Sequence, residues 1–315
     1  MHAPTPDYPP LHTKLIFNPI AGAPDETPLQ LIDVINELQA WNILPEVYLV
    51  EPDSDLAMVV QDALQGGLRM FVVCGGDGTI DSVAAELADS NKATLGIIPT
   101  GTRNNVALSL GIPEDIHKAA ALLRTGRRIR VDLGFVACGG IQRHFLEFCS
   151  VGLLSSLYPP ADDIQHGKFA RIGDLLAELV SSQPAEMHLV LGEHREINTR
   201  GHMLLAANMP YIGPHFRIAP EGVFNDGLLD VVVFTGLSKL DLLSDALQIA
   251  EGRLEDPRVQ SYRVDKVEIH TDPPMPVLAD GVSLGEGPLR IAVRRHSLSV
   301  MAGAAESNAA SQSAT

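Results

Sequence analysis

The chain has 315 residues, 45% of them hydrophobic, and carries a formal net charge of −16 at pH 7. This length supports one large domain or two ordinary domains with separate hydrophobic cores, and we expect two. The negative charge argues against nucleic acid as a partner and against stable adhesion to an anionic membrane, because both surfaces attract clustered Lys and Arg.

The sequence also lacks the marks of a secreted or membrane-spanning protein. No apolar stretch approaches the roughly twenty residues that a spanning helix needs, and the N-terminus has no signal-peptide pattern, so we expect a cytoplasmic protein. The cysteines, Cys74, Cys138 and Cys149, show no metal-ligand spacing, and their odd number argues against a disulfide framework. Buried free thiols are therefore predicted.

Up to about residue 130 the sequence alternates between short apolar runs and longer helical patterns. Strands are predicted at 14–18, 45–50, 70–74 and 95–98, and helices at about 28–40, 54–65 and 79–89. A further helix begins at Val106 and ends at Gly111, ahead of Pro113. This rhythm predicts a doubly wound, Rossmann-like α/β domain whose ligands bind at the carboxyl ends of its strands.

From Val131 onward the pattern changes to successive strands. They are predicted at 130–137, 142–150, 186–191, 201–207, 227–234, 266–271, 276–279, 287–293 and 297–301, with helical intervals at about 167–182 and 238–251. The second domain should therefore be β-rich and β-sandwich-like. We predict domains at 1–130 and 131–303, followed by a disordered tail at 304–315 that is rich in Ala and Ser.

The most informative segment is an apolar run that ends in Gly75-Gly76-Asp77-Gly78-Thr79. Glycines let the backbone approach a phosphate closely, and the N-terminus of the following helix adds a positive dipole end. Thr79 offers a hydroxyl, and Asp77 can orient a phosphate-bound cation. An ordinary strand-to-helix turn is the competing interpretation, and this motif alone leaves both open.

Three further polar segments favour the functional interpretation. Asn18 to Gly22 follows the first strand, Thr100 to Asn105 follows the strand at 95–98, and Asp226-Gly227-Leu228-Leu229-Asp230 opens an apolar strand. The first two segments and the glycine-rich motif all lie at carboxyl ends of parallel strands. Their convergence is therefore expected from the topology alone.

In this order and at these distances, the four segments resemble the diacylglycerol kinase catalytic family, which includes soluble bacterial lipid kinases and sphingosine-kinase relatives. Val131-Asp132-x-Gly134 belongs to the same pattern, and the resemblance covers nearly the whole chain. It implies ATP- and Mg²⁺-dependent phosphorylation of a diacylglycerol-like or related lipid in a cleft between the two domains. With a net charge of −16, contact with a lipid substrate in the membrane would have to be transient, and we consider a homodimer.

The resemblance assigns roles to individual residues. Asp77 would organise the catalytic Mg²⁺, and Asp132 and Asp226 would belong to a metal and water network. A structural Mg²⁺ would be held by Asp226 and by the backbone carbonyls of Val223 and Leu228, although a plain turn aspartate stays open as an alternative. The implied nucleotide-binding residues are Asn18, Pro19, Ile20, Ala21, Gly22, Gly75, Gly76, Asp77, Gly78, Thr79, Ile80, Asp81 and Thr102.

The departures from the family pattern concern catalysis. Ser82 and Asn105 replace usual acidic residues, and Val282 stands where the family's general base, a glutamate, is assigned. A lipid hydroxyl needs a proton acceptor within hydrogen-bond reach, so this loss should cost orders of magnitude in rate unless another group serves. Asp280 is the expected substitute, on the same face as Val282 if the segment is extended, and Glu286 is a weaker one.

Two alternatives therefore stay open beside an active lipid kinase. One is an NAD-kinase-like enzyme with a soluble acceptor, which would share Gly-Gly-Asp-Gly-Thr. The other is a nucleotide-binding protein of the same fold whose catalysis is impaired, and Val282, Ser82 and Asn105 favour it.

Overall fold

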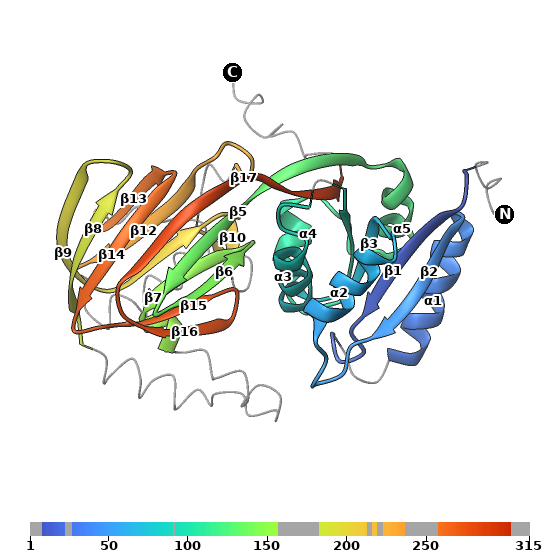
Figure 1. Cartoon of the computed structure of the whole chain (residues 1–315), viewed down its shortest axis with the longest axis horizontal. Coiled ribbons are helices and arrows are strands. Elements are labelled where there is room, and N and C mark those ends of the chain that lie inside the picture. The colour runs from blue at the N-terminus through green and yellow to red at the C-terminus, as the bar shows by residue number, and fades with distance from the viewer. Residues whose placement is uncertain are drawn as a thin grey trace, which may run out of the picture. The chain divides into compact units, whose positions relative to one another are not determined.

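The computed structural model describes residues 8–22, 27–90, 92–156, 183–212, 216–218, 223–236 and 258–303 (Figure 1). The chain divides into two compact units, one made of residues 1–130 with 298 onward, and one of Val131–Ser297. The division after Arg130 lies where the sequence places the domain boundary. From Leu298 on, however, the chain returns to the first unit, because Val300 pairs with Leu95 in its sheet. The predicted helices at 167–182 and 238–251 and the predicted tail lie outside the described residues.

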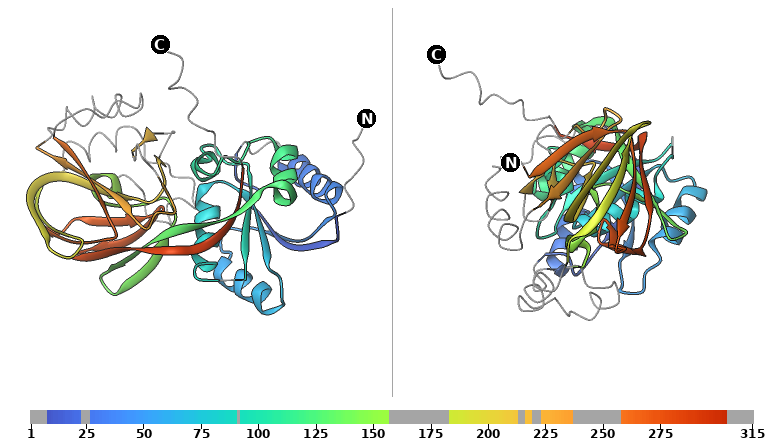
Figure 2. Two further views of the ribbon diagram at one scale, coloured as in Figure 1. Left: turned by 90° about the horizontal axis from the view of Figure 1, so that it is seen from above. Right: turned by 90° about the vertical axis from the view of Figure 1, so that its left-hand side faces the viewer.

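The first unit is built on a parallel sheet with the strand order β17-β4-β3-β1-β2. Its strands are β1 (Leu11–Phe17), β2 (Ile43–Leu49), β3 (Met70–Gly75), β4 (Thr94–Pro99) and the end of β17 (Leu289–Ala302). Its helices are α1 (Thr27–Ala40), α2 (Leu56–Gln65), α3 (Asp77–Glu86), α4 (Asn105–Ser109) and α5 (Ile116–Thr125). Helix α1 packs against α5, and α2 against α3, so that helices lie on both faces of the sheet (Figure 2). The predicted doubly wound domain is confirmed.

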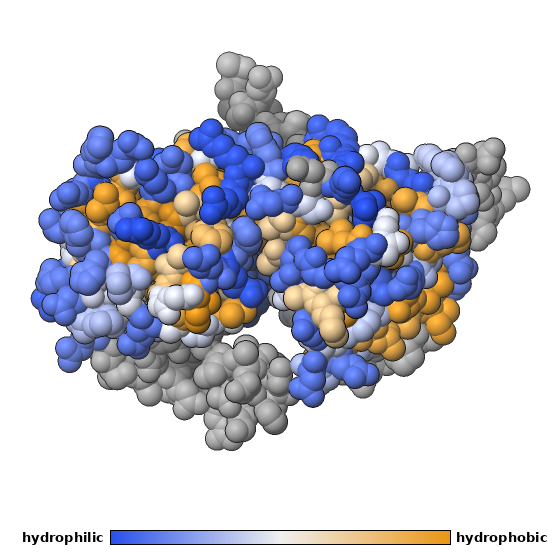
Figure 3. All heavy atoms as spheres, viewed as in Figure 1, coloured by the Kyte–Doolittle hydropathy of each residue, from blue (hydrophilic) through white to orange (hydrophobic). Residues whose placement is uncertain are grey.

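The central strands β3 and β4 are buried along their whole length, as expected for a parallel sheet covered on both faces. Strand β2 lies at the sheet edge and carries exposed apolar residues, and Figure 3 shows apolar surface over this side of the unit. These residues are Leu44, Val47 and Leu49. The homodimer considered from the sequence stays a prediction, for which this edge offers exposed apolar surface.

Arg124, near the end of α5, fastens that helix to the segments around β1. Its Nε donates to the carbonyl of Trp41 at 3.1 Å, and its Nη2 donates to the carbonyls of Pro9 at 2.7 Å and Asn42 at 2.8 Å. The guanidinium also lies over the ring of Tyr8, and burial lowers the pKa of Arg124. The basic residue thus has a structural role in the first unit.

The second unit is an antiparallel β structure with the strand order β16-β15-β7-β9-β8-β14-β17. Two further pairs of strands extend it: β12 pairs with both β9 and β13, and β5 pairs with both β17 and β6. The strands are β5 (Arg127–Cys138), β6 (Ile141–Phe145), β7 (Phe148–Gly152), β8 (Ala185–Leu191), β9 (Arg195–Ala207), β12 (Leu229–Thr235), β13 (Val259–Val264), β14 (Lys266–Asp272), β15 (Pro276–Ala279) and β16 (Val282–Glu286). The short elements are α6 (Leu153–Ser156), β10 (Tyr211–Ile212) and β11 (Phe216–Arg217). The predicted β-rich second domain is confirmed.

Several strand predictions in this unit are wrong. Strand β9 begins at Arg195 instead of at 201, and β13 was not predicted. The strand predicted at 142–150 is divided into β6 and β7, because the N–H groups of Leu146 and Glu147 donate to Asp280 instead of to a neighbouring strand. The two strands predicted at 287–293 and 297–301 form the single strand β17, within which His296 adopts a φ of 51°.

Gly134 of β5 has a packing role. It pairs with Phe145 of β6, and a Cβ atom at Gly134 would lie 1.9 Å from the ring of Phe145. Only glycine leaves room for this buried ring, which accounts for the glycine of the Val-Asp-x-Gly motif.

Cys74, Cys138 and Cys149 are free and buried, as predicted. In the described part of the chain, none of the helices combines the length and apolar character that crossing a bilayer requires.

Candidate functional site

In the first unit, the loops that follow β1, β3 and β4 are held together by hydrogen bonds. The N–H of Asn18 donates to the carbonyl of Cys74 at 2.9 Å, and the N–H of Thr100 donates to the carbonyl of Gly75 at 3.1 Å. The side-chain amide of Asn18 donates to the hydroxyl of Thr79 at 2.8 Å. The loops predicted to converge from topology therefore do so in the structure.

Asp77 is the first residue of α3, and its half-buried carboxylate joins two of these loops. One oxygen accepts the N–H of Asn105 at 3.1 Å, and the other accepts the N–H of Val106 at 3.2 Å. Asp77 therefore caps the start of α4 from a different loop. A partly exposed carboxylate at this edge of the sheet also provides the oxygen ligands that Mg²⁺ prefers, so the position fits a nucleotide-bound cation.

Glycines let these loops approach each other at backbone distance. A Cβ atom at Gly101 would lie 2.4 Å from the Cα of Gly76, and one at Gly22 would lie 2.5 Å from the carbonyl oxygen of Thr100. Gly78 is different, since it is exposed and a Cβ there would meet nothing within 4 Å. The open space at Gly78 lies at the N-terminus of α3, where the helix dipole favours a phosphate.

The loop after β4 is braced by Asn104, which sequence reasoning did not single out for this role. Asn104 is buried in the left-handed conformation, with φ of 54°, and its side chain both accepts from the N–H and donates to the carbonyl of Gly101, each at 2.9 Å. Asparagine adopts the left-handed conformation more readily than most residues, and this preference was the sequence signal that could have indicated the role of Asn104.

The other predicted nucleotide-binding residues have different exposures. Ile20 and Thr102 are exposed, whereas Ile80 and Asp81 of α3 have buried side chains, so the side chain of Ile80 contributes to the core. Ser82, one of the departures from the family pattern, donates its hydroxyl to the carbonyl of Gly78 at 2.8 Å.

In the second unit, the carboxylate of Asp280 is bonded to three consecutive backbone N–H groups. One oxygen accepts from Leu146 at 2.5 Å, and the other accepts from Glu147 at 3.1 Å and from Phe148 at 3.0 Å. Burial raises the pKa of Asp280 to about 6, and the N–H donors and the charge of Arg143 oppose this rise. Asp280 thus anchors the chain between β6 and β7.

The segment around Asp280 is not extended, which corrects the geometry expected for a substitute base. Asp280 and Gly281 have φ values of 43° and 77° and connect β15 to β16, whose residues Ala279 and Val282 pair directly. This is a two-residue hairpin turn, for which Asp-Gly is the preferred sequence. Asp280 and Val282 therefore do not share one face of a strand. Glu286, at the far end of β16, is exposed.

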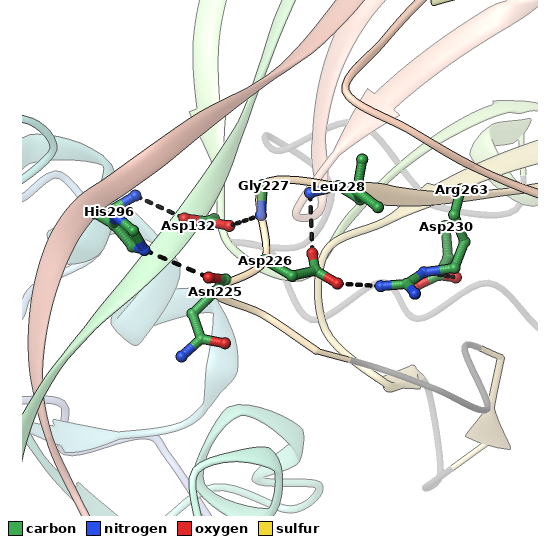
Figure 4. A network of polar contacts seen from close by, with 8 residues as sticks. All are labelled: Asp132, Asn225, Asp226, Gly227, Leu228, Asp230, Arg263 and His296. Carbon is green, nitrogen blue, oxygen red and sulfur yellow. Dashed lines mark hydrogen bonds and ion pairs between the residues drawn. The ribbon is translucent and has the colours of Figure 1, made fainter.

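A second polar network in this unit surrounds the turn at 225–228 (Figure 4). The fully buried Asp132 accepts the N–H of Gly227 at 2.7 Å and the N–H of His296 at 2.6 Å. Nε2 of His296 lies 3.3 Å from the carbonyl oxygen of Asn225. Asp132 therefore holds the turn in place through backbone donors.

The predicted metal ligands lie beside this network, and both oxygens of Asp226 already have partners in the structure. One oxygen of Asp226 accepts the N–H of Leu228 at 3.0 Å, and the other is ion-paired with the guanidinium of Arg263 (Figure 4). Val223 is exposed. Across the described residues, no group of three or more His, Cys, Asp and Glu side chains could hold a metal ion. A guanidinium thus stands where the cation was expected.

Two family descriptions match the chain. Residues 12–136 match the diacylglycerol kinase catalytic domain, and residues 163–302 match the YegS C-terminal NAD kinase β-sandwich-like domain. The diacylglycerol kinase of Bacillus subtilis is 25% identical over 276 residues, which cover 85% of this chain and 88% of the relative. A probable YegS-like lipid kinase of Pectobacterium atrosepticum is 29% identical and covers 89% of this chain and 92% of the relative.

Solved structures show the same fold. A diacylglycerol kinase of Bacillus anthracis superposes with a TM-score of 0.71 at 21% identity, covering 93% of this chain and 97% of that chain. An NAD kinase of Archaeoglobus fulgidus in complex with ATP superposes with a TM-score of 0.52 at 12% identity, covering 93% of this chain and 94% of that chain. The two matched domains together span most of the sequence and agree with the α/β and β-rich units of the structure, so the chain combines a diacylglycerol kinase catalytic domain with a YegS C-terminal domain, and its homologues are diacylglycerol kinases and YegS-like lipid kinases.

Proposed function

We propose that the protein transfers the γ-phosphoryl group of ATP, with Mg²⁺, to the hydroxyl of a diacylglycerol-like or related lipid. The observation that carries this proposal is the joining of three strand-end loops through Asp77 and Asn18, with open space at Gly78. Phosphoryl transfer depends mainly on positioning and charge neutralisation, which such loops supply through backbone N–H groups. The names of the Bacillus and Pectobacterium relatives support a lipid as the acceptor.

In this proposal the nucleotide lies against Asn18 to Gly22 and Thr102, and its phosphates lie at Gly75 to Asp81. The N-terminus of α3 contributes a partial positive charge there. Mg²⁺, when bound with ATP, would neutralise charge on the transferring group, and Asp77 would hold or orient it. Contact with the membrane would be brief, because the net charge of −16 opposes adhesion to anionic lipid.

Asp280 is the proposed proton acceptor, since a carboxylate with a pKa of about 6 suits a base that works near neutral pH. Its oxygen facing Leu146 has one N–H donor, whereas the other oxygen has two.

A second candidate function, nucleotide binding without transfer, is favoured by one observation. Asp280 lies in a hairpin turn as an anchor, and Val282 offers no carboxylate.

The test is phosphorylation of a lipid panel with labelled ATP and Mg²⁺. The panel comprises diacylglycerol, monoacylglycerol, ceramide, sphingosine and phosphatidylglycerol, with NAD as the soluble acceptor. We expect one lipid to be labelled and Asp77→Asn to reduce the rate by about 100-fold or more. Asp55→Asn is the matched control, because Asp55 caps α2 in the same unit by accepting the N–H of Met58 at 3.0 Å.

The outcomes separate the alternatives. Labelled NAD in place of lipid would indicate an NAD-kinase-like enzyme. ATP binding by calorimetry without any labelled product would indicate the non-catalytic nucleotide binder. An equal loss of activity in the Asp77 and Asp55 variants would refute a specific role for Asp77 and would indicate loss of fold.

A further inference from the structure

Arg263 is fixed beside the turn at 225–228 by the sheet itself. In the antiparallel pair of β12 and β13, Arg263 lies directly opposite Asp230. Its guanidinium reaches back along β12, with Nε 3.6 Å from an oxygen of Asp230 and Nη2 ion-paired with Asp226. The strand register therefore aims one guanidinium at two carboxylates, one within the turn and one just after it in β12 (Figure 4).

The three partners are sheltered enough for this arrangement to be specific. The side chains of Arg263, Asp226 and Asp230 are 31%, 26% and 11% exposed. A guanidinium presents several donors in a rigid plane, so one Arg can bridge two carboxylates that a divalent cation would otherwise link.

A second guanidinium lies on the same turn. A Cβ atom at Gly227 would fall 2.1 Å from Nε of Arg295, so this side chain packs directly over the Gly227 backbone. The remaining carboxylate of the network, Asp132, already accepts two backbone N–H groups. A divalent cation at this turn would have to displace Arg263 and would also face the positive charge of Arg295.

We infer that Arg263 takes the place of a structural divalent cation, so that the turn at Asp226–Asp230 folds and stays folded without bound metal. The inference concerns the second unit only. It does not depend on the proposed function, in which Mg²⁺ accompanies ATP in the first unit. It further implies that removing the guanidinium opens a weak metal site made of Asp226, Asp230 and nearby carbonyl oxygens.

The experiment compares the full-length wild type with Arg263→Gln in EDTA, in Mg²⁺ and in Ca²⁺, without nucleotide. Every protein compared carries Cys74→Ala, so that dithiodipyridine labelling of the buried Cys138 and Cys149 follows thermal unfolding of the second unit alone. We expect the same midpoint for the wild type in all three conditions. The Arg263→Gln variant should unfold about 4 °C lower in EDTA and recover most of this loss in roughly millimolar Ca²⁺.

Arg290→Gln is the matched control. Arg290 forms an exposed ion pair with Glu268, at 3.2 Å, on neighbouring strands of the same unit. This variant should show no response to metal. If Arg263→Gln does not fold in EDTA, Arg263→Lys, which keeps the positive charge, is measured in its place and should fold without responding to metal.

Two results would overturn the inference. One is a wild-type midpoint that rises by several degrees in Mg²⁺ or Ca²⁺, because a metal would then bind with Arg263 in place. The other is an Arg263→Gln variant that is as stable as the wild type in EDTA or gains nothing from either metal.

Discussion

Asp280→Asn is the substitution whose effect the structure defines most closely. Asparagine keeps one carbonyl oxygen but points an amide N–H₂ toward the remaining backbone donor among Leu146, Glu147 and Phe148. Losing one charge-assisted bond to a buried N–H should cost about 1.5–3 kcal/mol. The substitution also removes a buried negative charge, whose desolvation raises the pKa of Asp280 from 3.8 to about 6. The two effects oppose each other at neutral pH.

Their pH dependence separates them. Because the folded state holds the proton of Asp280 more tightly than the unfolded state, its contribution to stability is complete below pH 3.8 and is lost as the pH rises through about 6. A rise of about two pKa units, at about 1.4 kcal/mol each, is worth about 3 kcal/mol. Because pH 4 lies just above the unfolded pKa, most but not all of this difference develops between pH 7 and pH 4, and the free energy of unfolding of the wild type minus that of Asp280→Asn should increase by about 2.5 kcal/mol over this range.

Urea unfolding between pH 4 and 7.5 measures this difference, with each unit followed by its own probe. Both proteins carry Cys74→Ala, so that dithiodipyridine, which reacts at acidic pH, labels only Cys138 and Cys149, both of the second unit, when that unit opens. The single tryptophan, Trp41, reports the first unit by fluorescence and should show the same transition in both proteins.

A difference that stays constant from pH 4 to pH 7 would refute the reasoning, since the carboxylate would then titrate alike in the folded and unfolded chains. A difference that shrinks toward pH 4 would show that the three N–H donors outweigh burial. If Asp280 is also the proton acceptor, kcat/KM of the wild type should fall tenfold per pH unit below about pH 6.

Two further substitutions test the first unit. Gly101→Ala places a Cβ atom 2.4 Å from the Cα of Gly76 and should weaken ATP binding by roughly tenfold or more. The control is Gly66→Ala, whose Cβ would have no neighbour closer than 3.4 Å and which should bind ATP like the wild type. Equal ATP affinities of the two variants, measured by calorimetry, would contradict this prediction. Arg124→Met removes three hydrogen bonds to carbonyls and should destabilise the unit by about 2 kcal/mol in urea unfolding followed by Trp41 fluorescence. An unchanged transition would mean that Arg124 is dispensable.

The first unit could be predicted closely from the sequence because its signals are local. Apolar runs separated by helical patterns define a doubly wound sheet, and the topology then brings the strand-end loops of Asn18 and Gly75 together. The close approach of Gly76 and Gly101 could not be predicted, because it depends on how two loops distant in sequence meet in space.

The second unit was predicted less well because its decisive contacts are long-range. Asp280 divides a predicted strand at Leu146, although the two residues are far apart in the sequence. Its Asp-Gly dipeptide did carry a local signal for a hairpin turn, whereas the sequence analysis treated the segment from Asp280 to Val282 as extended. The pairing of Arg263 with Asp226 follows from strand register, which no pattern within either segment specifies.

The motif residues of both units share one physical property: their side-chain oxygens accept backbone N–H groups of loops and turns, in every case but Asn104 from another segment of the chain. Asp77 caps α4, Asn104 braces its own loop, Asp132 holds the turn at Gly227, and Asp280 anchors the chain between β6 and β7. Each of these side chains fixes backbone geometry before any ligand binds. A loss of activity on replacing one of them therefore combines lost chemistry with a displaced loop. A chemical role can be assigned to one of these residues only if the substituted unit unfolds with the same transition as in the wild type, measured with the probe for that unit.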